Sequence, residues 1–420
     1  MSVGQWRKLD VVEGIERGTL TIAEGAQVLG LSRRQMQRVR SKVKALGAAG
    51  VIHGNTGRTP KHKTSELVAD HVVKLWRNKY TGFNDRHFTE KLEAKEGIVL
   101  SRSTVRRMLR AAGIGPARSR RPPKYRRRRD RRPQAGQMIL WDGSRHDWLE
   151  HRGPRLCLIG AIDDATGELL PGAHFVEQEC TLGYLRVLRE IVKHKGVPLS
   201  AYMDRHGALK RNDRHWTLEE QLAGHQEPTQ VKRALDDLGI QAIYALSPQA
   251  KGRVERLWGT LQDRLVSELR LAKASTIDQA NEVLAAYIPE HNRRFAIEPQ
   301  HAAPAWRSCP PGLTPEEICA LQYARIVRND NTIKVGKRLI EIRQNPSRST
   351  YAKACVIVRH LLDGGYRVYF GNQLIARTKG APPTSPEQEP RTPEKRKARQ
   401  ERLNLRERLK RQEATDSLTN

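Results

Sequence analysis

Cysteine and aromatic residues are scarce in this sequence. Its 420 residues include five cysteines, and phenylalanine, tryptophan and tyrosine together make up 5%. The cysteines lie far apart, and none forms the C-x-x-C pair that is typical of zinc sites. This spacing predicts reduced thiols, with neither a disulfide framework nor a zinc site. The five are Cys157, Cys180, Cys309, Cys319 and Cys355.

Long apolar segments are also missing. No run of about 18 apolar residues occurs, and the N-terminus does not have the charged and apolar regions of a signal peptide. The sequence therefore predicts a soluble, cytoplasmic protein with no membrane partner.

Acidic residues are few relative to basic ones. Lysine and arginine number 76 against 46 aspartates and glutamates, which gives a formal charge of +30. Such a chain repels itself unless a polyanion neutralises it, and nucleic acid is the polyanion that we expect. Because a domain usually has roughly 100–200 residues, the length predicts about three units in a multi-domain α/β protein.

The N-terminal region, residues 1–50, has the pattern of a helix-turn-helix DNA-binding domain. Helices are expected at Ile22–Leu29 and from Arg33 onward, joined by a turn at Gly30–Ser32, with Ser32 as the N-cap of the second helix. Small residues at Ala26 and Gly30 would let the helices approach closely. The alternative is a solvated basic helix. Side chains expected to face DNA are Arg33, Arg34, Gln35, Gln37 and Arg38.

A second helical, winged-helix-like DNA-binding domain is expected at 60–114. A Ser/Thr cap again precedes an apolar stripe, and Arg102 and Arg106 lie outside this stripe. Residues 115–135 follow as a basic, proline-rich linker whose Arg126 and Arg127 would lie along DNA phosphates. A nuclear-import signal is the alternative explanation for this basic run.

Residues 136–274 change to alternating strands and helices. Strands are expected at Gln137–Asp142, Arg155–Asp163, Leu169–Val176, Leu199–Met203 and Ile240–Ala245, with helices at Thr181–Lys195 and Thr229–Leu238. Turn-rich joints favour an antiparallel pairing of the first three strands, whereas the helices act as parallel crossovers. The order βββαβαβα predicts a ribonuclease H-like mixed sheet.

The remaining chain is expected to form three segments. A helical connector spans 275–322, and six short strands in 323–380 predict a small β-barrel. The last segment, 381–420, is rich in proline and charge and has no aromatic residue, which indicates disorder or a helix formed with a partner.

Two aspartates follow apolar strand residues in the central region. Asp142 follows four apolar residues, and Asp204 ends a similar run before Gly207. A charge there is costly unless a cation or partner meets it, although a strand-end turn would also explain each residue alone.

A third acid, Glu255, lies in a predicted helix with Ser247 as N-cap and Pro248 at its first position. A salt bridge with Lys251 is the alternative role for Glu255. In the predicted fold, however, a strand-one Asp, a strand-four Asp and a final-helix Glu meet at one sheet edge. Three such carboxylates can hold two divalent ions about 4 Å apart for phosphoryl transfer on DNA.

Four motifs resemble the catalytic core of insertion-sequence transposases of the ISNCY-type group, which are related to retroviral integrases. They are Trp141–Ser144 (WDGS), Leu158–Thr166 (LIGAIDDAT), Tyr202–Gly207 (YMDRHG) and Ser247–Asp263 (SPQAKGRVERLWGTLQD). The resemblance implies that Asp142, Asp204 and Glu255 are a metal-binding DDE triad. The 50 residues between Asp204 and Glu255 exceed the usual spacing in relatives, which fits a polar insertion at Lys210–Gln226.

The expected function is therefore DNA cleavage at element ends and strand transfer into target DNA, with two Mg²⁺ ions that Mn²⁺ can replace. Lys251 and Arg253 would hold DNA phosphates near the triad. Expected partners are the terminal repeats and target DNA, bound by a homo-oligomer associated with a bacterial-type nucleoid. The alternatives are a catalytically silent, sequence-specific DNA-binding regulator and a nuclease of the same fold that cuts without joining.

Overall fold

The computed structural model describes residues 1–56, 64–116, 129–211, 216, 218–224, 226–245, 252–344 and 348–386. The chain divides into two compact units, Met1–Val73 and Lys74–Asn420. This division lies inside helix α4 (Glu66–Asn78), whereas the sequence predicted a boundary between residues 50 and 60.

The first unit contains helices α1 (Val3–Glu16), α2 (Ile22–Leu29) and α3 (Arg33–Leu46) and the short 3₁₀ helix η1 (Gly47–Val51). Both predicted helices are confirmed, and Ser32 accepts a hydrogen bond from the Gln35 backbone as the predicted N-cap. The three helices pack around a small core that consists of Val11, Val12, Ile15, Ala26 and Met36.

Gly25 allows α2 to pack closely against α1. A Cβ there would lie 2.7 Å from Cδ1 of Ile15. The sequence predicted this role for Gly30, and that prediction was wrong. Gly30 has open space around it and a φ of +64°, so it ends α2 in the left-handed conformation that glycine adopts readily.

Residues 64–116 contain three helices, namely α4, α5 (Asp85–Glu96) and α6 (Arg102–Ala111). Ser101 caps α6 by accepting a hydrogen bond from the Thr104 backbone. The helices agree with the predicted second helical region, but this described stretch has no strand and therefore no wing.

A five-stranded mixed sheet forms the centre of the second unit, with the order β3-β2-β1-β4-β5. The pairs β1–β2 and β2–β3 are antiparallel, and β1–β4 and β4–β5 are parallel, as the sequence predicted. This arrangement is that of a ribonuclease H-like core. The strands are β1 (Ile139–His146), β2 (Leu156–Asp163), β3 (His174–Val176), β4 (Ser200–Met203) and β5 (Gln241–Tyr244).

Strand β3 is shorter than predicted. Leu169 makes only an isolated bridge to Ile162, and regular pairing begins at His174. Pro171 lacks a backbone N–H and Gly172 has a φ of +87°, so these residues interrupt the strand.

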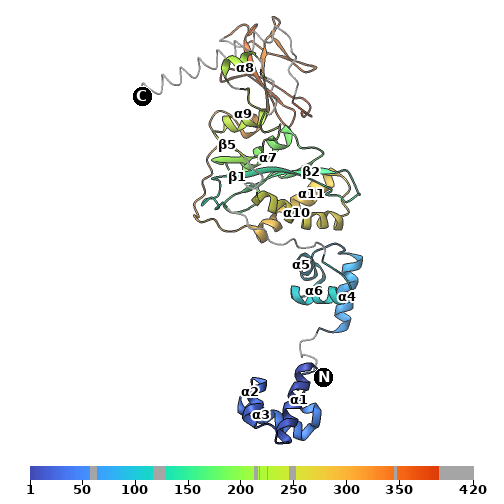
Figure 1. Cartoon of the computed structure of the whole chain (residues 1–420). Coiled ribbons are helices and arrows are strands. Elements are labelled where there is room, and N and C mark those ends of the chain that lie inside the picture. Colours follow the sequence, from blue (N-terminus) through green and yellow to red (C-terminus); the bar gives the residue numbers. More distant parts are fainter. Residues whose placement is uncertain are drawn as a thin grey trace. The chain divides into compact units, whose positions relative to one another are not determined.

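Helices cover both faces of the sheet (Figure 1). One face packs against α7 (Thr181–His194) and α9 (Gln230–Asp237), and the other packs against α10 (Gly252–Leu271) and α11 (Ile277–Phe295). Alternate side chains of β1 supply the two cores, since Trp141 lies in the first and Leu140 in the second. A short helix, α8 (Leu218–Ala223), lies in the predicted polar insertion.

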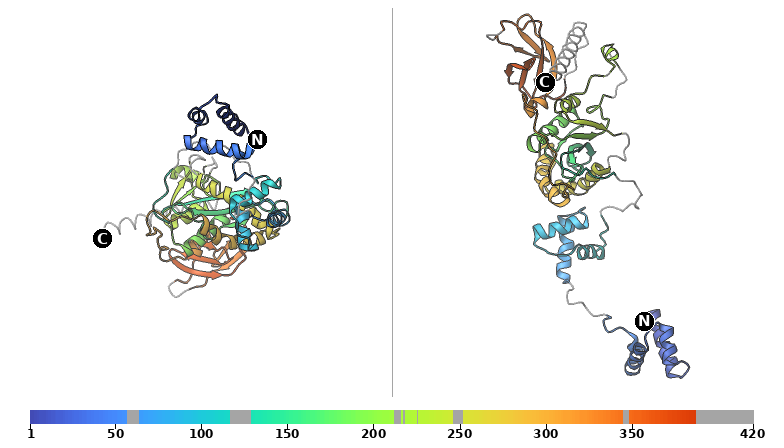
Figure 2. Two further views of the ribbon diagram at one scale, coloured as in Figure 1. Left: turned by 90° about the horizontal axis from the view of Figure 1, so that it is seen from below. Right: turned by 90° about the vertical axis from the view of Figure 1, so that its left-hand side faces the viewer.

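The C-terminal strands are open sheets, and the predicted closed β-barrel is not seen among the described residues. Four strands pair in the order β11-β10-β9-β6, while β7 and β8 form a separate hairpin, shown in orange and brown in Figure 2. The strands are β6 (Leu321–Ile326), β7 (Thr332–Val335), β8 (Arg338–Glu341), β9 (Cys355–His360), β10 (Tyr366–Phe370) and β11 (Gln373–Thr378).

Side chains of α9 cover the edge strand β6 and explain why it gains no further strand. The Gln230 amide donates to the Gln322 carbonyl and accepts from the Gln322 N–H, both at 2.9 Å. Arg233 donates to the carbonyls of Ile318, in the short helix α12 (Pro315–Ile318), and of Ala320. The backbone groups of Gln322 are therefore not free to pair with a further strand.

Several predicted features lie outside the described residues. They are most of the basic linker, the Ser247–Pro248 cap and most of the C-terminal tail. Among the described helices, none has the length and apolar character needed to cross a membrane.

Candidate active site

The sheet register places Asp142 and Asp204 side by side. Ile139 pairs with Ala201, and Leu140 pairs with Tyr202 on the adjacent parallel strand. Continuing this register by two residues brings Asp142 level with Asp204. Asp204 follows the end of β4 as predicted, but β1 continues past Asp142 to His146, so Asp142 lies within its strand and does not end it.

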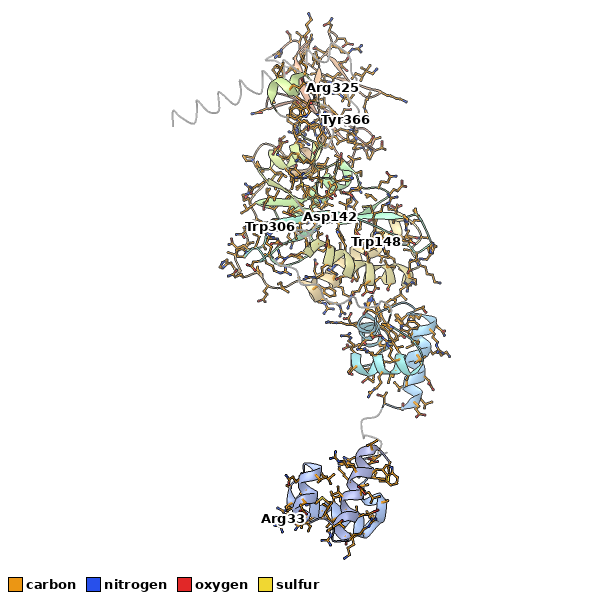
Figure 3. All side chains as sticks on the ribbon, in the orientation of Figure 1. Arg33, Asp142, Trp148, Trp306, Arg325 and Tyr366 are labelled. Carbon is orange, nitrogen blue, oxygen red and sulfur yellow. The ribbon has the colours of Figure 1, made fainter. Side chains whose placement is uncertain are left out.

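Asp142 faces helix α10. Side chains alternate along a strand, so Asp142 shares a face with Leu140, which packs in the α10 core. Trp258 confirms this direction, because its indole Nε1 donates to Oδ2 of Asp142 at 3.1 Å. Asp142 is marked in Figure 3.

Glu255 is exposed in the first turn of α10, three residues before Trp258. Seven residues after Glu255, the Gln262 amide donates to the Ser144 hydroxyl at 3.2 Å. One face of α10 therefore follows β1 from Asp142 to Ser144. On this face Gly259 has no atom within 4 Å of the position that a Cβ would occupy, which leaves an open strip beside the acids.

The donor chemistry of these residues fits magnesium. Carboxylate oxygens are the hard ligands that Mg²⁺ prefers, and Mg²⁺ usually needs only one or two carboxylates alongside waters and substrate phosphates. Among the described residues, no three Asp, Glu, His or Cys side chains come close enough together to hold one ion. The register thus aligns Asp142 and Asp204, while Glu255 is near them in the fold but not gathered into a closed cage.

Glu179, in the loop between β3 and α7, is an acid that sequence reasoning missed. The Tyr184 hydroxyl donates to its Oε1, and Nδ1 of His206 lies 3.4 Å from the same oxygen. Burial raises the pKa of Glu179, and the negative charges of Asp204 and Asp142 add to this rise.

The sequence signal for Glu179 is weak, because loop residues have no periodicity. The cue is Gly143, where a Cβ would lie 2.8 Å from the Glu179 carboxyl carbon. Glycine after Asp142 therefore leaves room for a fourth carboxylate. This room could be recognised only once the loop was placed.

Asp163 and Asp164 form the turn after β2. Asp163 accepts hydrogen bonds from the backbone of Gly136, Ala165 and Thr166, and burial raises its pKa. Asp164 has a fully buried side chain that accepts from two arginines. These arginines lower the pKa of Asp164 even though burial opposes the shift.

Two further acids lie away from this junction. Glu268 of α10 pairs with His87 and Lys91 of α5 at 2.6 Å. Asp263 accepts from the Asn84 amide at 2.5 Å. Both residues therefore connect α10 to the helices before the core and do not belong to the carboxylate group at Asp142.

Two known proteins align with most of the chain. The inferred transposase y4bF of Sinorhizobium fredii is 35% identical over 348 residues, which cover 82% of this chain and 74% of that protein. The transposase for insertion sequence IS1202 of Streptococcus pneumoniae is 32% identical over 326 residues, which cover 70% of this chain and 69% of that protein. The chain belongs to the insertion-sequence transposases. No family profile matches the transposase, and the ISNCY-type group stays a prediction.

Solved structures give more distant likenesses to the transposase. The simian T-cell lymphotropic virus intasome with the PP2A regulatory subunit B56 gamma is 15% identical, covers 75% of this chain and all of that chain, and has a TM-score of 0.30. The HTLV-2 integrase catalytic core domain with magnesium is also 15% identical and has a TM-score of 0.26. This likeness covers 36% of this chain and 84% of that chain. The fold of the transposase is therefore defined by its own sheet order and register.

The predicted DNA-facing residues of the transposase differ in what surrounds them. Seven are exposed on helices, and Arg33 is marked in Figure 3. Gln35 also accepts a hydrogen bond from the Ser32 backbone within its capping box, so it has a structural role. The exposed seven are Arg33, Arg34, Gln35, Gln37, Arg38, Arg102 and Arg106.

Of the other four DNA-facing candidates of the transposase, the structure describes Arg253. Arg126, Arg127 and Lys251 lie outside the described residues. Arg253 is described, but its guanidinium pairs with Asp164 at 2.5 Å, so a phosphate would have to displace or share this partner.

Proposed function

We propose that this transposase cleaves the ends of its element and joins the freed 3′ hydroxyl to target DNA, with Asp142, Asp204 and Glu255 as the metal-binding residues. The parallel register of β1 and β4, which brings Asp142 level with Asp204 just after β4, carries the proposal. The Trp258 hydrogen bond to Asp142 supports it, because it fixes α10 so that Glu255 lies one turn away.

Magnesium is the cofactor that the donor set favours, and Mn²⁺ should replace it. When bound, two Mg²⁺ ions would activate the attacking oxygen and stabilise the leaving oxygen. Asp142 is the residue best placed to contact both ions, because Asp204 lies on one side of it and α10 on the other. Asp204 and Glu255 would each complete one side.

The open strip beside Gly259 is where a DNA backbone would reach the acids. Neither Gly252 nor Gly259 has an atom within 4 Å of its Cβ position, so this face of α10 has room for a substrate. Lys251 and the exposed Arg256 would attract phosphates there.

Recognition of the terminal repeats is assigned to the helical regions before the core. Helix α3 has the exposed arginines and glutamines that read base edges in a major groove. Arg102 and Arg106 of α6, with Arg126 and Arg127 of the linker, would add phosphate contacts. Substituting Arg38 should weaken binding to element ends more than to unrelated DNA, and equal weakening would contradict a role in base reading.

A homo-oligomer would be needed to hold two element ends together, in association with nucleoid DNA. Sedimentation of the chain with paired-end DNA tests this expectation. A complex that contains one protein chain would contradict it.

Cleavage and strand transfer of a labelled element-end duplex with Mg²⁺ or Mn²⁺ test the activity. We expect joined products from the wild type and none from Asp142→Asn, Asp204→Asn or Glu255→Gln, all three of which should still bind DNA. Cleavage without joining would identify a nuclease. Specific binding without any cleavage would identify a regulator.

A further inference from the structure

Asp164 links the catalytic helix to the segment that enters the core. Its side chain is fully buried and accepts from Arg129 at 2.6 Å, from the Arg132 backbone at 2.8 Å and from Arg253 at 2.5 Å. The second guanidinium nitrogen of Arg253 donates to the Arg129 carbonyl. Arg253, in the first turn of α10, thus donates two hydrogen bonds, one to Asp164 and one to Arg129.

Arg253 precedes Glu255 by two residues. On the buried side of this turn, Val254 and Leu257 pack against the sheet, and apolar packing of this kind is not directional. A charged, two-point hydrogen bond is directional and fixes how the turn is rotated about its axis. The Arg253 bonds therefore set the direction in which the Glu255 carboxylate leaves the helix.

We propose that Asp164 and Arg253 are positioning residues that hold Glu255 at the metal site. This inference rests on the proposed function, in which Glu255 is a metal ligand. It gives Arg253 a role different from a phosphate contact, and it gives the second aspartate of the Asp163–Asp164 turn a role beyond the turn itself.

Arg256 provides a matched control. It lies in the same helical region as Arg253 and has the same charge, but it is exposed and forms no ion pair with another described residue. Neutralising either arginine removes one positive charge near the acids, which by itself should strengthen the binding of a divalent cation. Loss of Glu255 positioning should weaken this binding. The two effects have opposite signs.

The test is a titration of the full chain with Mn²⁺ in the absence of DNA. Binding is measured as the decrease of the free Mn²⁺ signal in electron paramagnetic resonance. We expect Arg256→Gln to bind Mn²⁺ as tightly as the wild type or more tightly. Arg253→Gln should bind about tenfold more weakly, as is usual when a residue that orients a metal ligand is lost. Arg253→Lys, which keeps the charge but has one point of attachment, should fall between them.

Glu255→Gln separates this inference from the proposed function. If Glu255→Gln does not weaken Mn²⁺ binding, the proposed metal site is wrong and the positioning role is lost with it. If Glu255→Gln weakens binding but Arg253→Gln behaves like Arg256→Gln, only the positioning role is wrong. Thermal melting checks folding of each variant, and Arg253→Lys serves as the test if Arg253→Gln does not fold.

Discussion

The hydrogen bond between Trp258 and Asp142 gives a prediction whose size follows from the structure. Trp258→Phe removes the Nε1–H that donates to Asp142 at 3.1 Å and keeps an aromatic ring in the core. A hydrogen bond to a charged group contributes about 1.5–3 kcal/mol. Because Asp142 is only half-buried, water can replace part of this bond, so we expect a loss of about 1.5–2 kcal/mol in the free energy of unfolding.

Trp148→Phe is the matched control. Trp148 is buried in the same core, and its Nε1 donates over the same 3.1 Å, but to the Ser144 backbone carbonyl and not to an acid of the site (Figure 3). Trp148→Phe should lower the free energy of unfolding by about 1 kcal/mol or more, because it removes a buried hydrogen bond. Its effect on the site should be small.

Urea unfolding and Mn²⁺ titration together test the prediction. Trp258→Phe should weaken Mn²⁺ binding about tenfold, because Asp142 loses the partner that orients it, whereas Trp148→Phe should leave this affinity unchanged. Equal affinity changes in the two variants would show that general loosening of the core is responsible. No change in either variant would refute the role of Trp258 in orienting Asp142.

Three further predictions concern neighbouring residues. The raised pKa of Glu179 means that its ionised form destabilises the fold. In thermal melts at a series of pH values, the wild type should lose stability as pH rises through this pKa, whereas Glu179→Gln should not. Burial opposes the shift, but hydrogen bonds from His87 and Lys91 lower the pKa of Glu268. The contribution of Glu268 to the free energy of unfolding should therefore be full at neutral pH and disappear as pH falls through this lowered pKa. Glu268→Gln should flatten this pH dependence of stability. Gly259→Ala should raise the free energy of unfolding in urea by about 0.5–1 kcal/mol. Gly259→Trp should fold normally but lose cleavage of element ends. If Gly259→Trp cleaves at the wild-type rate, DNA does not approach the acids along this strip.

The sheet was predictable from the sequence because its signals are local. Apolar runs that end in a charge or a turn residue mark the strands, and the two helical crossovers require parallel neighbours. Order and direction then follow, and with them the alignment of Asp142 with Asp204. The extent of each strand was less predictable, since β1 continues beyond Asp142 to His146 although Gly143 and Ser144 are residue types that are typical of turns.

The C-terminal region shows why a correct list of strands does not give an architecture. Six short strands were predicted and six form among the described residues, but closure depends on what covers each edge. Gln230 is nearly a hundred residues away from Gln322 in the chain, and its amide occupies the backbone groups that another strand would need. A pairing between a side chain and a distant backbone leaves no periodic signal in the sequence.

The acids of the candidate site are held by two different kinds of structure. Asp142 is placed by backbone pairing within β1, where a shift would break several hydrogen bonds at once, and Asp204 directly follows the paired strand β4. Glu255 is placed by side chains alone, through Trp258 on one side of the turn and Arg253 on the other. The same Asp164 that holds Arg253 also holds Arg129 of the basic linker. Substituting Asp164 should therefore disturb the third acid, while Asp142 and Asp204 stay in place.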